Sequence, residues 1–252
     1  MWGCGTGTES DQSTRPAGST AAFVCTTLGL QTLLIDKRLF PRDKLCGGLL
    51  TGRSKKLFER IYRRQWDAAL TNSSSDMTFC SDGELIAPEP NYQTLYFCMR
   101  REFDAYLLSL AQEAGGDFSL GVGLTKLNLE KSNLELSNGR IINYKVLIGA
   151  DGVNSQVGRE LFGRPFDPST IGFGLEVEVP IQDLPTQYNT VEIDFAATEW
   201  GYGWIFPKDS TYTIGVGGIH SLNPDMKERL EHYLGLKGLK SSSYRIKGQY
   251  IP

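Results

Sequence analysis

A short stretch near the amino terminus constrains the fold of this chain more than any other feature. Pro16 opens a run of small residues, "PAGSTAA", which suits a helix that packs closely against a sheet. Gly29 follows this helix, and "QTLLID" then predicts a short buried strand that ends at Asp36. A helix followed by a strand with a terminal acid is half of a dinucleotide-binding unit. The other half needs glycines before the helix, but Ser13 and Arg15 stand at two of those places.

The composition is that of an ordinary globular protein. A chain of 252 residues can bury a substantial core, as one large domain or two small ones. Its 26 basic and 29 acidic residues give a net charge of −3, which does not favour a nucleic-acid partner. One stretch, 53–64, holds six basic side chains. We interpret it as the solvated face of an amphipathic helix; the alternative is a patch that meets an anionic membrane or a phosphorylated substrate.

Targeting and cysteine patterns favour a reducing compartment. No apolar stretch reaches the roughly 18 residues of a membrane span, and the amino terminus lacks the apolar core of a signal peptide. The five cysteines are odd in number and scattered, with no Cys-x-x-Cys spacing. This pattern argues against a disulfide framework and against a structural zinc site. We therefore predict a cytoplasmic protein without a metal.

Helices and strands are interleaved along the rest of the chain. The stretch 124–149 alternates apolar and polar residues, and it predicts a meander that turns at Ser-Asn-Gly and ends in a buried strand, Lys145 to Gly149. Residues 170–219 predict a second group of strands. Helices are expected at 16–28, 55–66, 101–113 and 225–234, with a short one that ends at Phe162. This order is typical of an α/β (α+β) fold, in which a Rossmann-like layer is interleaved with an antiparallel sheet.

Three further stretches contain candidate ligand-binding or catalytic residues. Each can also be explained by a purely structural role. Cys46 precedes two glycines, which would let the backbone approach a flat ligand; a lone cysteine is more often a small core residue. In "VLIGADGVNS", Asp151 follows a predicted strand, as it would in a simple strand-to-helix turn. In "GYGWIFPKDSTYTIGVGG", an aromatic strand turns at Pro207 and meets glycines, as in a hairpin with an aromatic core.

Together these stretches resemble, in order and spacing, the geranylgeranyl reductase family of flavoproteins, within the group-2 flavin-monooxygenase fold. Pro41 to Gly48 is similar to the family's P-x-x-x-x-C-G-G motif, and "RREFD" to its R-x-x-F-D helix start. "GADGVNS" resembles the second FAD motif. Tyr202 to Gly217 is similar to the Y-x-W-x-F-P signature that is followed, seven residues later, by G-x-G. The resemblance covers about residues 16–252.

The resemblance implies FAD as cofactor and assigns residues to it. The implied cofactor-binding residues are Pro16, Ala17, Gly18, Asp36, Lys37, Cys46, Gly47, Gly48, Arg100, Asp151 and Gly152. The implied substrate-binding residues are Tyr202, Trp204, Phe206, Gly215 and Gly217. The first three of these share a spacing of two in a strand, so their side chains are expected on one face, as cavity or as core.

The resemblance also implies two domains. The FAD-binding domain would comprise residues 1–75 and 98–165, and the substrate-binding sheet domain residues 76–97 and 166–252. The family begins with a buried strand and a full G-x-G-x-x-G turn, and it carries a third FAD motif after a segment like "IKGQYIP". Because this sequence has neither, we predict a chain truncated at both ends. The polar segment 1–15 resembles replaced sequence, as from an alternative start or a frameshift.

The implied reaction is the reduction of carbon–carbon double bonds in an isoprenoid chain. Reduced FAD would give hydride to one alkene carbon while a proton reaches the other. Cys46 would donate that proton or only shape the pocket, whereas neither His220 nor His232 is assigned a role. NADPH or reduced ferredoxin would supply electrons, and the isoprenoid would be a small molecule or a lipid, with peripheral membrane contact. The alternatives are a monooxygenase or halogenase on the same fold, and a non-catalytic fragment that does not retain FAD.

Overall fold

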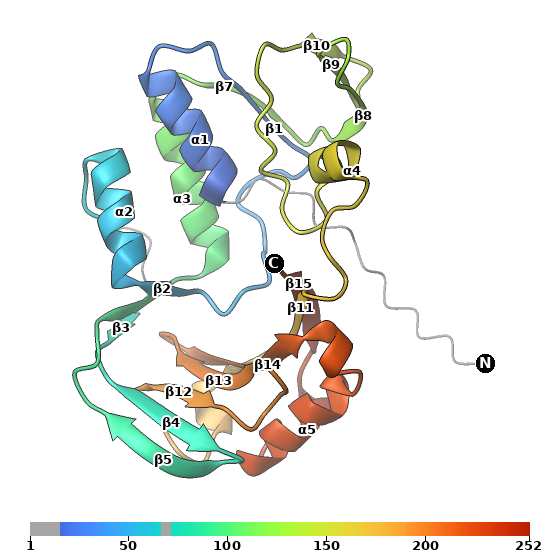
Figure 1. Ribbon diagram of the computed structural model, residues 1–252. Coiled ribbons are helices and arrows are strands. Elements are labelled where there is room, and N and C mark those ends of the chain that lie inside the picture. The colour runs from blue at the N-terminus through green and yellow to red at the C-terminus, as the bar shows by residue number, and fades with distance from the viewer. Residues whose placement is uncertain (1–15, 67–71) are drawn as a thin grey trace. The chain divides into compact units, whose positions relative to one another are not determined.

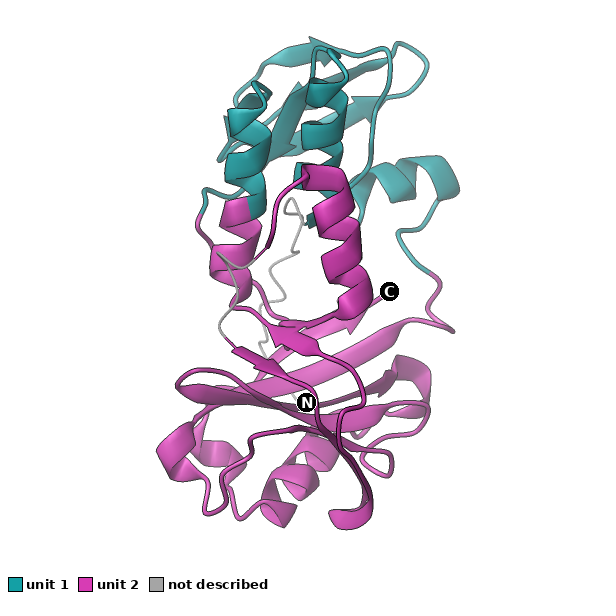
Figure 2. Ribbon diagram, turned by 90° about the vertical axis from the view of Figure 1, so that its left-hand side faces the viewer, with its two compact units in different colours: residues 1–40, 107–166 teal, residues 41–106, 167–252 magenta. Residues whose placement is uncertain are grey.

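The computed structural model describes residues 16–66 and 72–252. Two compact units share the chain: unit 1 consists of residues 1–40 and 107–166, and unit 2 of residues 41–106 and 167–252 (Figure 2). Residues 41–75 and 98–106, which we assigned to the FAD-binding domain, belong to the same unit as the large sheet. The expected division into an FAD-binding and a substrate-binding domain stays a prediction. Within the described ranges, no helix is long and apolar enough to cross a membrane.

Unit 1 combines a parallel pair of strands with helices and a small antiparallel sheet (Figure 1). Its elements are α1 (Pro16–Thr27), β1 (Leu33–Asp36), the second half of α3 (Arg100–Glu113), β7 (Asp117–Leu120), β8 (Leu124–Asn128), β9 (Asn133–Leu136), β10 (Ile141–Asn143) and α4 (Gln156–Phe162). β1 pairs in parallel with β7, while β8, β9 and β10 form the predicted meander. Ala22 of α1 packs with Leu34, Leu108 and Ala111 in one cluster, because a small side chain lets the helix approach the strand.

The predicted buried strand at Lys145 to Gly149 is wrong. These residues form no strand, and the side chains of Val146 and Ile148 are 78% and 54% exposed. An apolar run becomes a buried strand only where a neighbouring strand takes up its backbone hydrogen bonds. In the part of the chain that the structure describes, no strand pairs with this run. The segment before Pro16, for which no buried strand was predicted, lies outside the described residues.

Unit 2 is built on a seven-stranded sheet with the order β15-β11-β14-β13-β12-β4-β5. Its strands are β4 (Met77–Ser81), β5 (Glu84–Glu89), β11 (Gly172–Pro180), β12 (Val191–Asp194), β13 (Tyr202–Pro207), β14 (Thr211–Ile219) and β15 (Lys247–Ile251). All neighbours are antiparallel except β12 and β4. The unit also holds α2 (Gly52–Tyr62), α5 (Met226–Leu236), the start of α3, three short 3-10 turns, and a small sheet of β2 (Leu49–Thr51), β6 (Leu95–Phe97) and β3 (Asn72–Ser74).

The basic stretch forms α2, which begins three residues before the predicted start and ends four before the predicted end. The hydroxyl of Thr51 accepts a hydrogen bond from the backbone of Ser54 at the first turn. The helix ends at Arg63, whose backbone is left-handed (φ 57°). Phe58 and Tyr62 are buried one turn apart, while most of the basic side chains are exposed. The stretch is therefore an amphipathic helix, as its pattern predicted.

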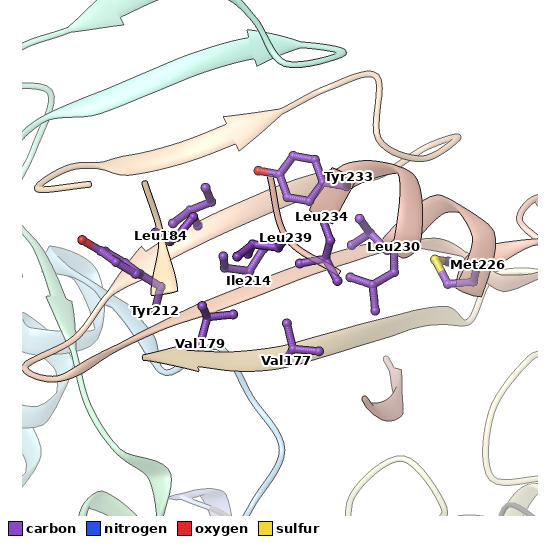
Figure 3. Packing of buried hydrophobic residues seen from close by; sticks show 12 residues of the cluster. Val177, Val179, Leu184, Tyr212, Ile214, Met226, Leu230, Tyr233, Leu234 and Leu239 are labelled. Carbon is purple, nitrogen blue, oxygen red and sulfur yellow. The ribbon is translucent and has the colours of Figure 1, made fainter. Parts of the chain in front are cut away.

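One face of the large sheet is covered by α5. Met226, Leu230 and Leu234 lie four residues apart along the helix and point toward Val177 and Ile214 of the sheet (Figure 3). This spacing places all three on one side of a helix. Burying each such side chain contributes about 1.5–3 kcal/mol. The helix and the sheet therefore share one apolar core.

Replacing Leu230, which is 0% exposed, with alanine removes the centre of this core. We expect Leu230→Ala to lower the free energy of unfolding by about 2–5 kcal/mol, because the cavity cannot fully collapse. Urea denaturation followed by circular dichroism measures this change. The control is Leu85→Ala on β5, whose side chain is 62% exposed and should alter stability by less than about 0.5 kcal/mol. Equal effects of the two variants would contradict this packing.

Candidate functional site

The face of the sheet opposite α5 carries the residues that the sequence motifs singled out; we call it the site face. In antiparallel strands, residues directly opposite one another point to the same side. Trp204 lies opposite Gly215, Gly215 opposite Glu176, and Glu176 opposite Lys247, so one row crosses four strands. The flanking rows are Phe206, Thr213 and Glu178 on one side, and Tyr202, Gly217 and Gly174 on the other.

The three aromatic residues of β13 share the site face, as their spacing predicted. The ring centroids of Tyr202 and Trp204 are 5.9 Å apart, as are those of Trp204 and Phe206. Trp204 and Phe206 are buried and pack with Leu95 and Phe97, whereas Tyr202 is 44% exposed. The aromatic row therefore runs from the core to the surface.

The indole of Trp204 lies across a glycine floor. A Cβ built on Gly215 would come 2.4 Å from Cζ2 of Trp204 and 2.6 Å from the carbonyl oxygen of Leu175. A Cβ on Gly217 would lie 3.3 Å from the same ring, and one on Gly174 3.5 Å. Glycine is needed here because the flat ring fills the space of the missing side chains. Gly215 and Gly217, expected to contact substrate, thus contact Trp204.

The Cys46-Gly47-Gly48 turn lies against the aromatic row. Gly48 has a left-handed backbone (φ +74°), and a Cβ there would lie 2.1 Å from the carbonyl oxygen of Cys98. Gly47 contacts the ring of Phe206, since its Cβ would lie 2.7 Å from that ring. The backbone amide of Cys98 donates to the carbonyl of Gly48 at 2.9 Å. Both glycines are therefore required by contacts within unit 2.

Two thiols lie at this turn, and only one is accessible. Cys46 is exposed, whereas Cys98 is buried. Burial raises the pKa of Cys98 to about 12, although the guanidinium of Arg100 acts in the opposite direction. Cys98 is therefore a neutral, inert thiol, and Cys46 is the thiol that can react.

A buried carboxylate holds two arginines beside the turn. Asp104, which is almost fully buried, accepts hydrogen bonds from Nε and Nη2 of Arg100 at 2.8 and 2.9 Å. Nη2 of Arg42 lies 3.2 Å from the same carboxylate. Burial acts to lower the pKa of Arg100, but the hydrogen bonds to Asp104 outweigh it and raise that pKa. The side chain of Cys46 also acts to raise the pKa of Arg100.

Acidic residues of β11 complete this part of the site face. Glu178 accepts hydrogen bonds from Nζ of Lys208 at 3.1 Å and from the hydroxyls of Thr211 and Thr213 at 3.0 and 2.7 Å. Glu176 is buried and stands opposite Gly215 on β14 and Lys247 on β15. Burial first, and then the charge of Glu178, raise the pKa of Glu176 to about 7. The carboxyl group therefore changes charge near neutral pH.

In unit 1, the predicted cofactor residues lie at the ends of α1 and β1. Pro16, Ala17 and Gly18 form the first turn of α1, in agreement with the predicted helix start. Asp36 is the last residue of β1; it is buried, and its Oδ1 accepts a hydrogen bond from the amide of Arg38 at 2.7 Å. The following residue, Lys37, is partly buried. The cofactor roles of these residues stay a prediction.

Asp151 caps a helix. Its Oδ1 accepts a hydrogen bond from the hydroxyl of Ser155 at 2.5 Å, and its Oδ2 accepts from the amides of Gln156 and Val157 at 2.6 and 3.2 Å. Gly152 has a left-handed backbone (φ +77°) that a larger residue rarely adopts. Both carboxylate oxygens of Asp151 are thus committed to α4, and a role at a ribose stays a prediction.

Each unit, taken by itself, has a feature that suits a flavin nucleotide. In unit 1, the buried Asp36 is the last residue of β1, the strand that follows α1. In dinucleotide-binding folds an acid at this position binds the ribose. In unit 2, the indole nitrogen of Trp204 is buried without a hydrogen-bond partner among the described residues, next to Gly47. A buried N–H that lacks a partner is costly, and a ligand acceptor would remove this cost.

The sequence analysis did not identify Asp104 and Glu176 as residues of the candidate site. Asp104 is the last letter of "RREFD", and its place four residues after Arg100 in a helix predicts the ion pair. Glu176 and Glu178 alternate with valines in "LEVEV", so two acids share one face of a buried strand. Such a pair in a central strand indicates a polar site on that face.

Sequence comparison finds relatives longer than this chain, and no family model matches it. An uncharacterized protein of Methanosarcina barkeri is 28% identical over 240 residues, which are 94% of this chain and 60% of that protein. Menaquinone reductase of Mycobacterium tuberculosis is 31% identical over 218 residues, which are 81% of this chain and 53% of the reductase. The chain thus spans between 53% and 60% of the length of these two relatives.

Structural comparison identifies the fold. A geranylgeranyl bacteriochlorophyll reductase-like protein of Thermoplasma acidophilum gives a TM-score of 0.71 with 23% identity, over 95% of this chain and 63% of that one. The flavin-dependent halogenase CmlS gives 0.71 with 20% identity, over 95% and 48%. The halogenase PltM, solved with FAD, gives 0.71 with 16% identity, over 94% and 58%. The chain has the fold of FAD-dependent oxidoreductases. The predicted α/β (α+β) fold class is confirmed.

Gly215→Ala tests the glycine floor under Trp204. The added methyl would collide with the indole and with the carbonyl of Leu175, so Trp204 must leave its place. We expect a loss of about 1–3 kcal/mol in unfolding free energy and a changed near-ultraviolet circular dichroism spectrum. The control, Gly235→Ala on α5, meets no atom within 4 Å and should gain up to about 1 kcal/mol. If the spectrum is unchanged in both variants, the indole of Trp204 does not pack against Gly215 as described.

Asp104→Asn tests the buried counter-charge. Two guanidinium groups would then lack their carboxylate, so we expect a loss of about 3–5 kcal/mol in unfolding free energy. The matched control is Glu102→Gln on the same helix, whose exposed side chain pairs with Arg101 at 4.0 Å. This change should cost less than about 0.5 kcal/mol. Urea denaturation of both variants makes the comparison, and similar losses would contradict the role of Asp104.

Proposed function

We propose that this chain is the flavin- and substrate-binding part of an FAD-dependent oxidoreductase that reduces carbon–carbon double bonds of an isoprenoid chain. The supporting observation is the meeting of three separate motifs within unit 2. The Cys46-Gly47-Gly48 turn contacts Phe206 of the aromatic row, and its thiol is close enough to the guanidinium of Arg100 to affect its pKa. The fold is the one in which flavin enzymes are built.

The residues of unit 2 have distinct parts in this proposal. The rings of Tyr202, Trp204 and Phe206 offer an apolar wall to a prenyl chain and exclude water from it. Arg100, fixed by Asp104, keeps a positive charge next to the exposed thiol of Cys46. When bound and reduced, FAD supplies a hydride for one alkene carbon. The thiol of Cys46 donates the proton for the other carbon and regains it from solvent.

The names of the relatives favour a reductase. One relative is a menaquinone reductase, and one structural neighbour is a geranylgeranyl bacteriochlorophyll reductase-like protein. Flavin-dependent halogenases share the fold equally well, with the same TM-score. The Cys46 turn and the aromatic signature favour the reductase, because both occur in the resemblance to geranylgeranyl reductases. The second hypothesis is a halogenase or monooxygenase. The third is a non-catalytic fragment that binds no flavin.

The proposed reaction also implies an electron donor and a substrate class. NADPH or reduced ferredoxin delivers the electrons, and the substrate is a prenylated small molecule or a lipid. A lipid substrate would bring the protein to a membrane surface, where the exposed basic side of α2 meets anionic headgroups. Nucleic acid has no part in it.

An absorption spectrum with added FAD tests the cofactor. We expect bands near ~370 and ~450 nm that stay with the protein after gel filtration. Asp36→Asn should weaken FAD binding by about 10-fold or more, because a buried acceptor for the ribose hydroxyls loses its charge. The control, Asp117→Asn, changes an exposed acid at the start of β7 and should bind as the parent does. Absence of a bound flavin would leave only the non-catalytic fragment.

The requirement for oxygen distinguishes the proposed reductase from a monooxygenase or halogenase. With flavin bound and chemically reduced, a geranylgeranyl substrate should lose double bonds under strictly anaerobic conditions, as mass spectrometry would detect in steps of two hydrogens. A product that forms only with oxygen, or with oxygen and halide, supports the monooxygenase or halogenase instead.

A further inference from the structure

We propose that Trp200 anchors this protein to a lipid bilayer. The residue belongs to the loop between β12 and β13, residues 195–201 of unit 2, and its indole would lie in the headgroup region. The contact with lipid stands on the geometry of unit 2 alone. Its use, the entry of a prenyl chain from the membrane along the aromatic row, rests on the proposed function.

Trp200 is exposed, and its backbone has a conformation that bulky residues rarely adopt. The side chain is 81% exposed, the largest exposed fraction of any large apolar side chain in the described ranges. Its φ angle is +50°, in the left-handed region. A single exposed aromatic residue needs no special explanation. An exposed tryptophan that also carries backbone strain contributes nothing to folding, so its role is expected in binding.

The backbone is fixed on both sides of Trp200. Before it, the amide of Glu199 donates a hydrogen bond to the side-chain oxygen of Asn223 at 2.8 Å. The side-chain amide of Asn223 donates back to the carbonyl of Glu199 at 2.9 Å. After it, Gly201 lies so close to β14 that a Cβ there would be 1.9 Å from the carbonyl oxygen of Gly217. The indole is therefore presented in one position, and little conformational entropy is lost when it binds.

The charges of the loop are compensated within the protein. Glu199 is the one charged residue of 195–201, and its carboxylate lies 3.7 Å from Nη2 of Arg229. Asp194, which precedes the loop, is fully buried and accepts a hydrogen bond from the amide of Ala196 at 3.0 Å. Burial of a lone charge against lipid is costly. A loop whose charges are paired or buried avoids this cost at a bilayer surface.

The position of Trp200 favours lipid over a protein partner. Tryptophan suits the boundary of a bilayer, because it joins a large apolar ring to an N–H donor. Two residues further, Tyr202 begins the aromatic row, which continues through Trp204 to the buried ring of Phe206. An apolar chain that leaves a bilayer at Trp200 would meet aromatic rings from the surface to the interior of the site face. A protein partner would need no such path.

Vesicles of neutral phosphatidylcholine test the anchor. Neutral lipid is used because it offers no net negative charge to the basic side of α2. We expect the full chain to sediment with the vesicles, and brominated acyl chains to quench its tryptophan fluorescence. Trp200→Gly should remove this quenching and lower the partition coefficient by about 10-fold or more, because a large apolar side chain is no longer buried in lipid. A parent chain that does not bind, or equal binding by Trp200→Gly, overturns the proposal.

The stability of Trp200→Gly separates an anchor from a structural residue. Glycine suits a φ angle of +50°, so the midpoint of urea denaturation should stay in place or rise. A lower midpoint would show that Trp200 stabilises the fold, which contradicts a role confined to lipid.

Phe162→Ser is the matched control for binding. Phe162 is a comparably exposed aromatic residue, 76% exposed at the end of α4 in unit 1. The variant should sediment with vesicles as the parent does. Equal losses in Phe162→Ser and Trp200→Gly would indicate general hydrophobic adsorption and refute a specific anchor.

Vesicles that also contain phosphatidylserine separate this contact from the basic side of α2. Raised salt should weaken only the additional binding that the anionic lipid causes, because salt screens exposed charges. Binding that occurs only with anionic vesicles, and that is lost at high salt, assigns the membrane contact to α2 and overturns the anchor. Because no flavin or substrate is present, these outcomes are independent of the proposed function, which the flavin spectrum tests separately.

Discussion

The contact of one flat ring with a floor of glycines organises the site face of unit 2. The indole of Trp204 occupies the space of a side chain at Gly215 and lies in contact with Gly217 and Gly174. It stacks on Phe206, and Phe206 in turn contacts Gly47. The absence of a side chain at Gly47 lets the Cys46 turn lie against these rings. The large sheet therefore has two unlike sides, an apolar core under α5 and a layer of aromatic rings and charges.

Much of this arrangement could be predicted from the sequence, because alternation along strands is a local property. The common face of Tyr202, Trp204 and Phe206 follows from a spacing of two, and the amphipathic α5 follows from apolar residues one turn apart. The run at 145–149 shows the limit. Its apolar letters predict a buried strand, yet Val146 is exposed because burial depends on a neighbour that local pattern does not reveal.

Interactions between distant residues were harder to predict. The contact of Gly48 with the carbonyl of Cys98 joins residues far apart in the sequence, and neither residue type alone indicates the other. The commitment of Asp151 to α4 was missed for a related reason. An acid followed by a helix start fits both a ligand site and a cap, and only the direction of its oxygens separates the two.

Glycines in a ligand-binding motif are usually explained by the ligand, and here the protein supplies a sufficient reason for several of them. Gly48 must avoid the carbonyl of Cys98, and Gly215 must make room for Trp204. A glycine-containing motif can therefore reflect the packing of a site as well as the ligand that the site binds. The charged groups differ, since a buried carboxyl such as Glu176 is unfavourable for packing at neutral pH. Packing alone therefore explains the glycines of this face better than it explains this acid.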